Sequence, residues 1–88
     1  MRYVSVVVQG RVQGVGYRQA TADRARELRV QGFVRNRDDG TVEVEAAGAD
    51  TQVAELLDWL ERGPPRARVE RIDCQELDEG PWQDFTVR

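Results

Sequence analysis

The order in which strand-like and helix-like patterns follow one another constrains the fold of this chain more than any other feature. Tyr3–Gln9 is rich in β-branched residues and alternates loosely, which predicts a strand. Tyr17–Arg29 then places small and apolar side chains at helical spacing, and Gly32–Asn36 returns to a strand pattern. The N-terminal part of the chain therefore predicts a strand, a helix and a second strand.

A hairpin and a second helix are predicted next. Asp39-Gly40 is a typical tight turn, and apolar and polar residues alternate after it over Thr41–Ala46, so we expect this segment to pair with the strand before it. Asp50 is expected to cap the start of the helix, and Gly63-Pro64-Pro65 is expected to end it. The helix itself has an apolar face at i, i+3, i+4, i+7 spacing, formed by Val53, Leu56, Leu57 and Leu60.

Two further strand patterns complete the chain. Arg68–Leu77 carries its apolar residues at uneven spacing, which predicts a strand with a bulge, and Phe85–Val87 predicts a short last strand. The order β-α-β-β-α-β, with one additional short strand, is typical of the split βαβ arrangement of ferredoxin-like sandwiches. We therefore expect an α+β fold in a single domain, residues 1–88, with two helices on one face of a mostly antiparallel sheet.

A glycine-rich segment, GRVQGVGYR at residues 10–18, joins the first strand to the first helix. Glycines at 10, 14 and 16 permit backbone conformations in which N–H groups converge, and the unpaired N–H groups of a helix N-terminus add to them. Arg18 can offer two parallel hydrogen bonds to the oxygens of an anion. The pattern predicts an anion-binding loop; the alternative is that the glycines serve only a tight strand-to-helix turn.

The predicted topology brings Asn36 to the same place. In a split βαβ fold the first two strands run in the same direction, so their ends lie at one edge of the sheet. Asn36 ends the second strand and should reach the rim beside residues 10–18. An asparagine there can be a turn former, or it can hold a water molecule in line with a phosphorus atom bound by the loop.

The composition removes several catalytic classes. The chain has no histidine and no lysine, so all 13 basic residues are arginine. This excludes catalytic triads that contain histidine, lysine Schiff bases and the lysine of a P-loop. A four-ligand zinc site lacks its cysteines and histidines, and we expect no metal and no other cofactor. The single cysteine, Cys74, is expected to be a small buried side chain.

Charge and hydropathy restrict the partners. The net charge of −3 argues against a nucleic-acid partner. The longest apolar run, Val6–Val8, is far shorter than the roughly 20 residues that a membrane-spanning helix needs. We therefore expect a cytoplasmic protein without a membrane contact, and we expect it to be a monomer.

The segments that carry these features resemble the acylphosphatase family. The stretches GRVQGVGYR, GFVRNRDDGTVEVEA, WLERGPPRARV and DFTVR are similar to that family over essentially the whole chain. The resemblance implies that Arg18 binds phosphate and that Asn36 positions water. It also implies that the phosphoryl group is bound by backbone amides of a loop comprising Gln13, Gly14, Val15, Gly16 and Tyr17. The chain departs from the commoner family pattern at Tyr17, at Leu28-Arg29-Val30 and at Phe33.

By resemblance, the chain is expected to be an enzyme that hydrolyses the carboxyl–phosphate bond of small acyl phosphates by direct attack of water. A departing carboxylate has a conjugate-acid pKa of about 4, so it needs no general acid, and the lack of histidine is no obstacle. The alternative is a non-catalytic phosphate- or anion-binding regulatory module on the same fold. Such a module needs the anion-binding loop, whereas only a hydrolase needs a water-holding Asn36.

Overall fold

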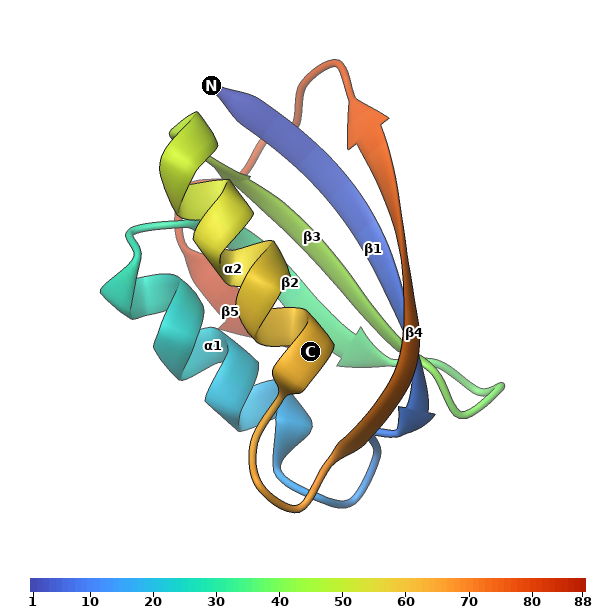
Figure 1. The fold of residues 1–88 in the computed structure, drawn as a ribbon. Coiled ribbons are helices and arrows are strands. Elements are labelled where there is room, and N and C mark those ends of the chain that lie inside the picture. Colours follow the sequence, from blue (N-terminus) through green and yellow to red (C-terminus); the bar gives the residue numbers. More distant parts are fainter.

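The computed structural model describes all residues, 1–88, as one five-stranded sheet with two helices packed on one of its faces (Figure 1). The predicted element order and the α+β class are confirmed. Neither helix is long and apolar enough to cross a membrane. The elements are β1 (Arg2–Arg11), α1 (Tyr17–Glu27), β2 (Gln31–Asn36), β3 (Val42–Gly48), α2 (Asp50–Arg62), β4 (Arg68–Leu77) and β5 (Phe85–Val87).

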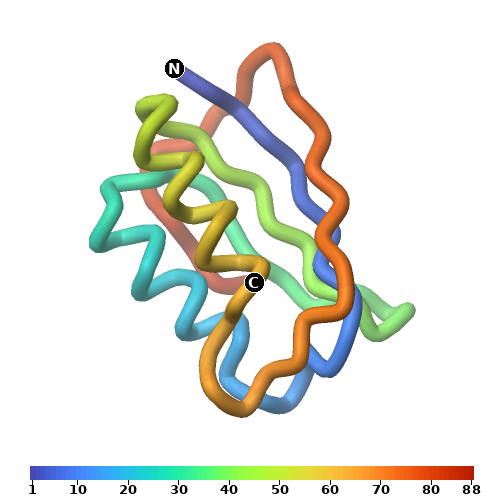
Figure 2. The backbone as a smooth tube through the Cα atoms, in the orientation of Figure 1, coloured from blue at the N-terminus to red at the C-terminus, as the bar shows by residue number.

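The sheet has the strand order β4-β1-β3-β2-β5. Strand β3 pairs antiparallel with both β1 and β2, so β1 and β2 run in the same direction without being neighbours. Strand β5 adds in parallel to β2, at the edge opposite β4. The segment after β1 and the turn after β2 consequently lie at the same end of the sheet (Figure 2), as the sequence predicted.

The core lies between the sheet and the two helices. On β1 the side chains of Val4, Val6 and Val8 are fully buried, and Leu56 and Leu60 of α2 pack into the same cluster. This burial follows from the period-two pattern of β1 and the helical spacing of the α2 leucines.

Tyr17, the first residue of α1, is buried, and its hydroxyl donates to the backbone oxygen of Leu60 at 2.8 Å. Its ring lies 5.8 Å from that of Trp59, measured between centroids. Burial raises the pKa of the Tyr17 phenol above its ordinary value, so the hydroxyl stays protonated and available as a donor. The start of α1 is thereby tied to the end of α2.

The predicted bulge is present, and it changes the interpretation of Gly10. Gln9 pairs with Arg71 whereas Gly10 pairs with Val69, so one residue of β4 is left without a partner. Gly10 has a φ of 131°, and a Cβ there would come within 2.2 Å of the Arg68 carbonyl oxygen. Gly10 therefore belongs to β1 and serves the close approach of β4, and the expectation that it is part of the anion-binding loop is wrong.

Three other local expectations are wrong. Asp50 is the first residue of α2 rather than its cap, which is Ala49; its carboxylate lies in the first turn, where the helix dipole favours a negative charge. Cys74 is exposed rather than buried because β4 is an edge strand. Helix α1 ends at Glu27, earlier than predicted, and Arg29 takes the left-handed conformation (φ 57°) that glycine usually fills after a helix.

Candidate active site

The loop between β1 and α1 presents backbone N–H groups without partners. Gly14 and Gly16 have φ of 74° and 80°, and a Cβ at either position would meet nothing within 4 Å. Backbone conformation, and not lack of space, therefore requires glycine at both positions. None of the N–H groups in residues 12–16 donates to a backbone acceptor, and the first helical bond runs from Ala20 to Gly16. The loop and the first turn of α1, which follow each other directly in the chain, therefore both carry backbone N–H groups that are free to bind an anion.

A pocket of about 230 Å³ opens at this loop. Four of the predicted phosphate-site residues line it, and Asn36 joins them from the end of β2. The side chains of Gln13 and Val15 point elsewhere, since Val15 is buried in the core and the Gln13 amide bonds to the β2–β3 turn. These two residues can offer an anion only their backbone N–H groups. The sequence interpretation missed three lining residues, for which no local pattern was available. The full lining is Val12, Gly14, Gly16, Tyr17, Arg18, Gln19, Asn36 and Val87.

Arg18 lies in the first turn of α1 and is half-buried. Its Nη1 donates to the backbone oxygen of Arg88 at 2.9 Å, which holds the guanidinium beside Val87 at the pocket. Arg18 forms no ion pair with a side-chain carboxylate. Its charge and its remaining N–H groups are therefore available to an anion in the pocket.

Asn36 is the last residue of β2, and its carboxamide oxygen is buried without a hydrogen-bond donor. A turn-forming asparagine would bond to the backbone close by. In this turn the bond is made instead by Asp39, whose Oδ1 accepts from the Thr41 N–H at 3.0 Å. A buried amide oxygen normally has a hydrogen-bond donor, so the unpaired oxygen of Asn36 favours a role at the pocket over a role in the turn.

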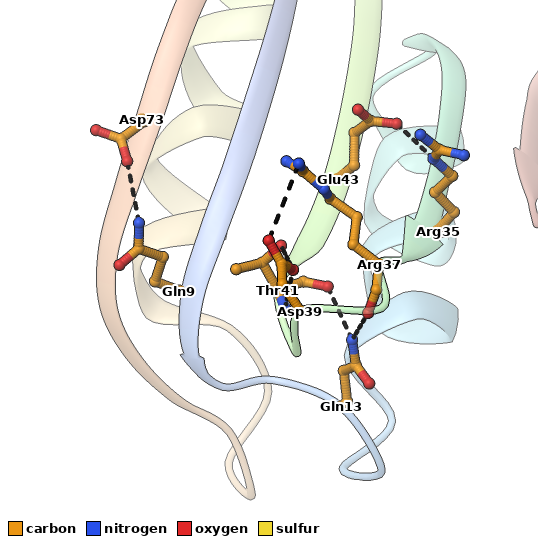
Figure 3. A network of polar contacts seen from close by, with 8 residues as sticks. All are labelled: Gln9, Gln13, Arg35, Arg37, Asp39, Thr41, Glu43 and Asp73. Atoms are coloured by element: carbon orange, nitrogen blue, oxygen red, sulfur yellow. Dashed lines mark hydrogen bonds and ion pairs between the residues drawn. The ribbon is translucent and has the colours of Figure 1, made fainter.

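The arginines on either side of Asn36 are paired with carboxylates at the surface (Figure 3). The distance is 2.5 Å from Arg35 Nε to Glu43 Oε1 and 3.9 Å from Arg37 Nη2 to Asp39 Oδ2. Arg35 and Glu43 lie on β2 and β3, whereas Arg37 and Asp39 lie in the turn between these strands. A second pocket of about 360 Å³ opens there, lined only by polar residues: Arg35, Asn36, Arg37, Asp38 and Asp39. No three histidine, cysteine, aspartate or glutamate side chains of the chain come together as metal ligands.

These features define a class of protein: a small α+β domain with an anion-binding pocket between the end of its first strand and the start of its first helix. The acylphosphatase family model matches residues 4–87. Together with the relatives described below, this match shows that the chain belongs to the acylphosphatase family, as its motifs predicted.

Proteins named acylphosphatase are similar to the chain over most of its length. Those of Actinobacillus succinogenes and Acidovorax sp. (strain JS42) are 52% and 51% identical to it, over 91% and 92% of this chain and 90% and 84% of their own. The one from Thiobacillus denitrificans is 44% identical over 100% of this chain and 98% of its own. These relatives support an acylphosphatase activity over the non-catalytic alternative.

Two solved structures give the same result for the fold. The crystal structure of acylphosphatase from Bacillus subtilis superposes with a TM-score of 0.96 at 31% identity, covering 100% of this chain and 99% of that one. An acylphosphatase from Coxiella burnetii gives 0.95 at 37% identity, with coverage of 99% and 92%.

Proposed function

We propose that the chain hydrolyses the carboxyl–phosphate bond of small acyl phosphates in the pocket between β1 and α1. The observation that carries the proposal is that one pocket is lined by loop residues with unpaired N–H groups, by an arginine without a side-chain carboxylate partner and by Asn36 with its unpaired carboxamide oxygen. Family membership supports the substrate class, and the pocket geometry supports the assignment of the residues.

The backbone N–H groups of Gln13–Tyr17 and the guanidinium of Arg18 bind the non-bridging phosphoryl oxygens in this proposal. Hydrogen bonds from a guanidinium to phosphate are charge-assisted, and the positive end of the α1 dipole adds to them. Because the loop conformation is set by Gly14 and Gly16, these donors are already in place before the substrate arrives. Donors that need no rearrangement stabilise the charge of the transition state most effectively.

The carboxamide of Asn36 holds the attacking water on the side of phosphorus opposite the acyl group. The water oxygen forms a bond to phosphorus while the bond from phosphorus to the acyl oxygen breaks, and the carboxylate leaves with the electron pair. It needs no proton, since its conjugate acid has a pKa of about 4. Phosphate oxygens accept the proton of the water. Positioning of this kind is worth roughly 7–11 kcal/mol in favourable cases.

The remaining properties of the proposed enzyme follow from this chemistry and from the sequence. Arginine and backbone amides meet the phosphoryl charge, so the reaction is metal-independent and requires no cofactor. The protein acts on its small-molecule substrate as a cytoplasmic monomer, without nucleic acid as a partner.

One assay tests the proposal. The purified protein is given benzoyl phosphate or p-nitrophenyl phosphate, each with and without a chelator. We expect rapid turnover of benzoyl phosphate in both conditions and little turnover of the phenyl ester, whose leaving group is poorer. Failure to hydrolyse benzoyl phosphate would contradict the function, and inhibition by the chelator would contradict metal independence.

A further inference from the structure

The side-chain amide of Gln13 is turned away from the phosphate pocket. Its Nε2 donates to the backbone oxygen of Arg37 at 2.8 Å and to that of Thr41 at 2.9 Å, both in the β2–β3 turn (Figure 3). Arg37 directly follows Asn36. A single NH₂ group therefore links the glycine loop to the residue next to Asn36.

This link is the only hydrogen-bonded connection between the loop of residues 12–16 and the turn of residues 37–41. Strands β1 and β2 are not neighbours, because β3 lies between them, so no strand pairing joins the loop directly to Asn36. The loop and the turn extend beyond the ends of the strands, where their relative position depends on their own contacts. Among these contacts, the Gln13 amide supplies the hydrogen bonds.

The turn offers Gln13 acceptors that are already held in place. The Thr41 oxygen also accepts from the Arg37 N–H at 2.9 Å, which closes the turn. Asp39 Oδ1 accepts from the Thr41 N–H and from the Thr41 hydroxyl. Because these bonds restrict the turn, a contact with its carbonyl oxygens also restricts Asn36 at its start.

We propose that Gln13 is a positioning residue of the reaction: its side-chain amide sets the distance between the phosphoryl group in the loop and the water held by Asn36. The inference rests on the proposed function. Attack requires reacting atoms about 3–3.5 Å apart, and a misplacement of about 1 Å can cost roughly 100-fold in rate. The Gln13 side chain touches neither phosphate nor water and acts through the turn.

The decisive variant is Gln13→Met, which keeps the length of the side chain and removes both donors. We expect kcat on benzoyl phosphate to fall about 10- to 100-fold, while the inhibition constant of inorganic phosphate changes less than about threefold, since backbone N–H groups still bind the anion. The matched control is Gln9→Met, because the Gln9 amide makes a surface contact with Asp73 at 3.4 Å. This control is expected to keep the parent kcat.

A double-mutant cycle separates positioning from a general structural role. In an Asn36→Ala background the water is no longer held, so Gln13→Met should cause no further loss of kcat. An equal loss in both backgrounds, a kcat within about twofold of the parent, or a phosphate affinity that falls as much as kcat would each overturn the inference. Circular dichroism checks folding, and Gln13→Ala repeats the comparison. If neither variant folds, Gln13 is a structural residue and the inference is wrong.

The cycle also tells the two proposals apart. A normal kcat for Asn36→Ala alone contradicts the water-holding role in the proposed function, and the inference falls with it. A low kcat for Asn36→Ala together with a normal kcat for Gln13→Met contradicts the inference alone.

Discussion

The glycine loop is held on its two sides by contacts of different kinds. On the helix side, the buried contact joins the Tyr17 hydroxyl to the Leu60 oxygen, within the core and beside Trp59. On the strand side, the turn contact joins the half-buried Gln13 amide to the β2–β3 turn, whose charged groups are exposed. A buried bond is worth more to folding, because breaking it leaves an unsatisfied group away from water.

The two sides of the loop serve different purposes. The buried contact fixes where α1 starts and adds to the stability of the fold. The turn contact adjoins Asn36 and bears on the geometry of the reaction. We therefore expect damage on the helix side to appear as lower stability and damage on the strand side as lower kcat, and four predictions test this contrast.

The largest effect is expected from Arg18→Lys, in the first turn of α1 directly after the loop that both contacts hold. Lysine keeps the charge but loses the planar pair of donors, so kcat/KM should fall about 100- to 1,000-fold and phosphate should bind more weakly. The melting temperature should stay close to that of the parent, because the Arg18 side chain contributes one partly exposed bond. Steady-state kinetics and thermal unfolding measure both. The control is Arg24→Lys, on the same helix but outside the pocket, which should keep the parent activity. If Arg18→Lys retained more than a tenth of the parent activity, the role assigned to Arg18 would be contradicted.

Asn36→Ala is expected to have the next largest effect. Removing the carboxamide should lower kcat about 100-fold, while inorganic phosphate still binds, since only the placement of water is lost. Stability should not fall, because the substitution removes a buried oxygen without a partner. Turnover, phosphate inhibition and the melting temperature are measured on the same sample. Near-normal turnover would mean that another group holds the water.

Tyr17→Phe tests the buried contact itself. The ring and its packing on Trp59 are kept, but the Leu60 oxygen loses its donor, which should cost about 1–2 kcal/mol of unfolding free energy, or roughly 4–16 °C in melting temperature. Activity well below the transition should stay within about threefold of the parent, since the loop N–H groups are unchanged. Denaturant unfolding with parallel kinetics measures both quantities. A large loss of kcat without loss of stability would reverse the contrast between the two sides.

The smallest effect concerns the pH dependence of the turn. The Thr41 hydroxyl and the Thr41 N–H both donate to the Asp39 carboxylate and lower its pKa below the ordinary value of about 3.9. A lowered folded-state pKa contributes stability that is present above the unfolded pKa and is lost as the pH falls through the folded one. Between pH 5 and 8 the turn should therefore not respond to Asp39.

An NMR titration of the Asp39 carboxyl carbon should give a midpoint below about 3.9, and the Thr41 amide shift should follow the same curve. Asp39→Asn, which keeps an acceptor oxygen, should leave kcat at neutral pH nearly unchanged. A midpoint above the ordinary value would show that the Thr41 bonds do not form in solution.

Much of the fold and part of the site could be predicted because the signals are local or topological. The strand and helix periodicities, the Asp39-Gly40 turn and the glycines at 14 and 16 each depend on neighbours in the sequence. The position of Asn36 beside the loop followed from the direction of the first two strands, which the split βαβ order predicts. The family resemblance rested on the same segments, and the family match confirms it.

The errors and omissions concern features that depend on distant parts of the chain. Glycine is required at position 10 because β4 passes close to the backbone there, which no local sequence pattern indicates. Cys74 is exposed because its strand lies at an edge of the sheet. Val87 lines the pocket because β5 adds in parallel beside β2. The destination of the Gln13 amide, 24 and 28 residues further along the chain, could not be read from its neighbours.

The amino-acid sequence by itself determined the order of the elements, the presence of glycines 14 and 16 between the first strand and the first helix, and the presence of arginine and amide groups that can bind an anion. Backbone preference and side-chain chemistry are properties of residues and their neighbours. Only the tertiary structure decided which of those groups face one pocket and which amide joins the loop to the turn. The reason is that β3 lies between β1 and β2, so the segments that follow these two strands meet at one pocket only in the folded sheet.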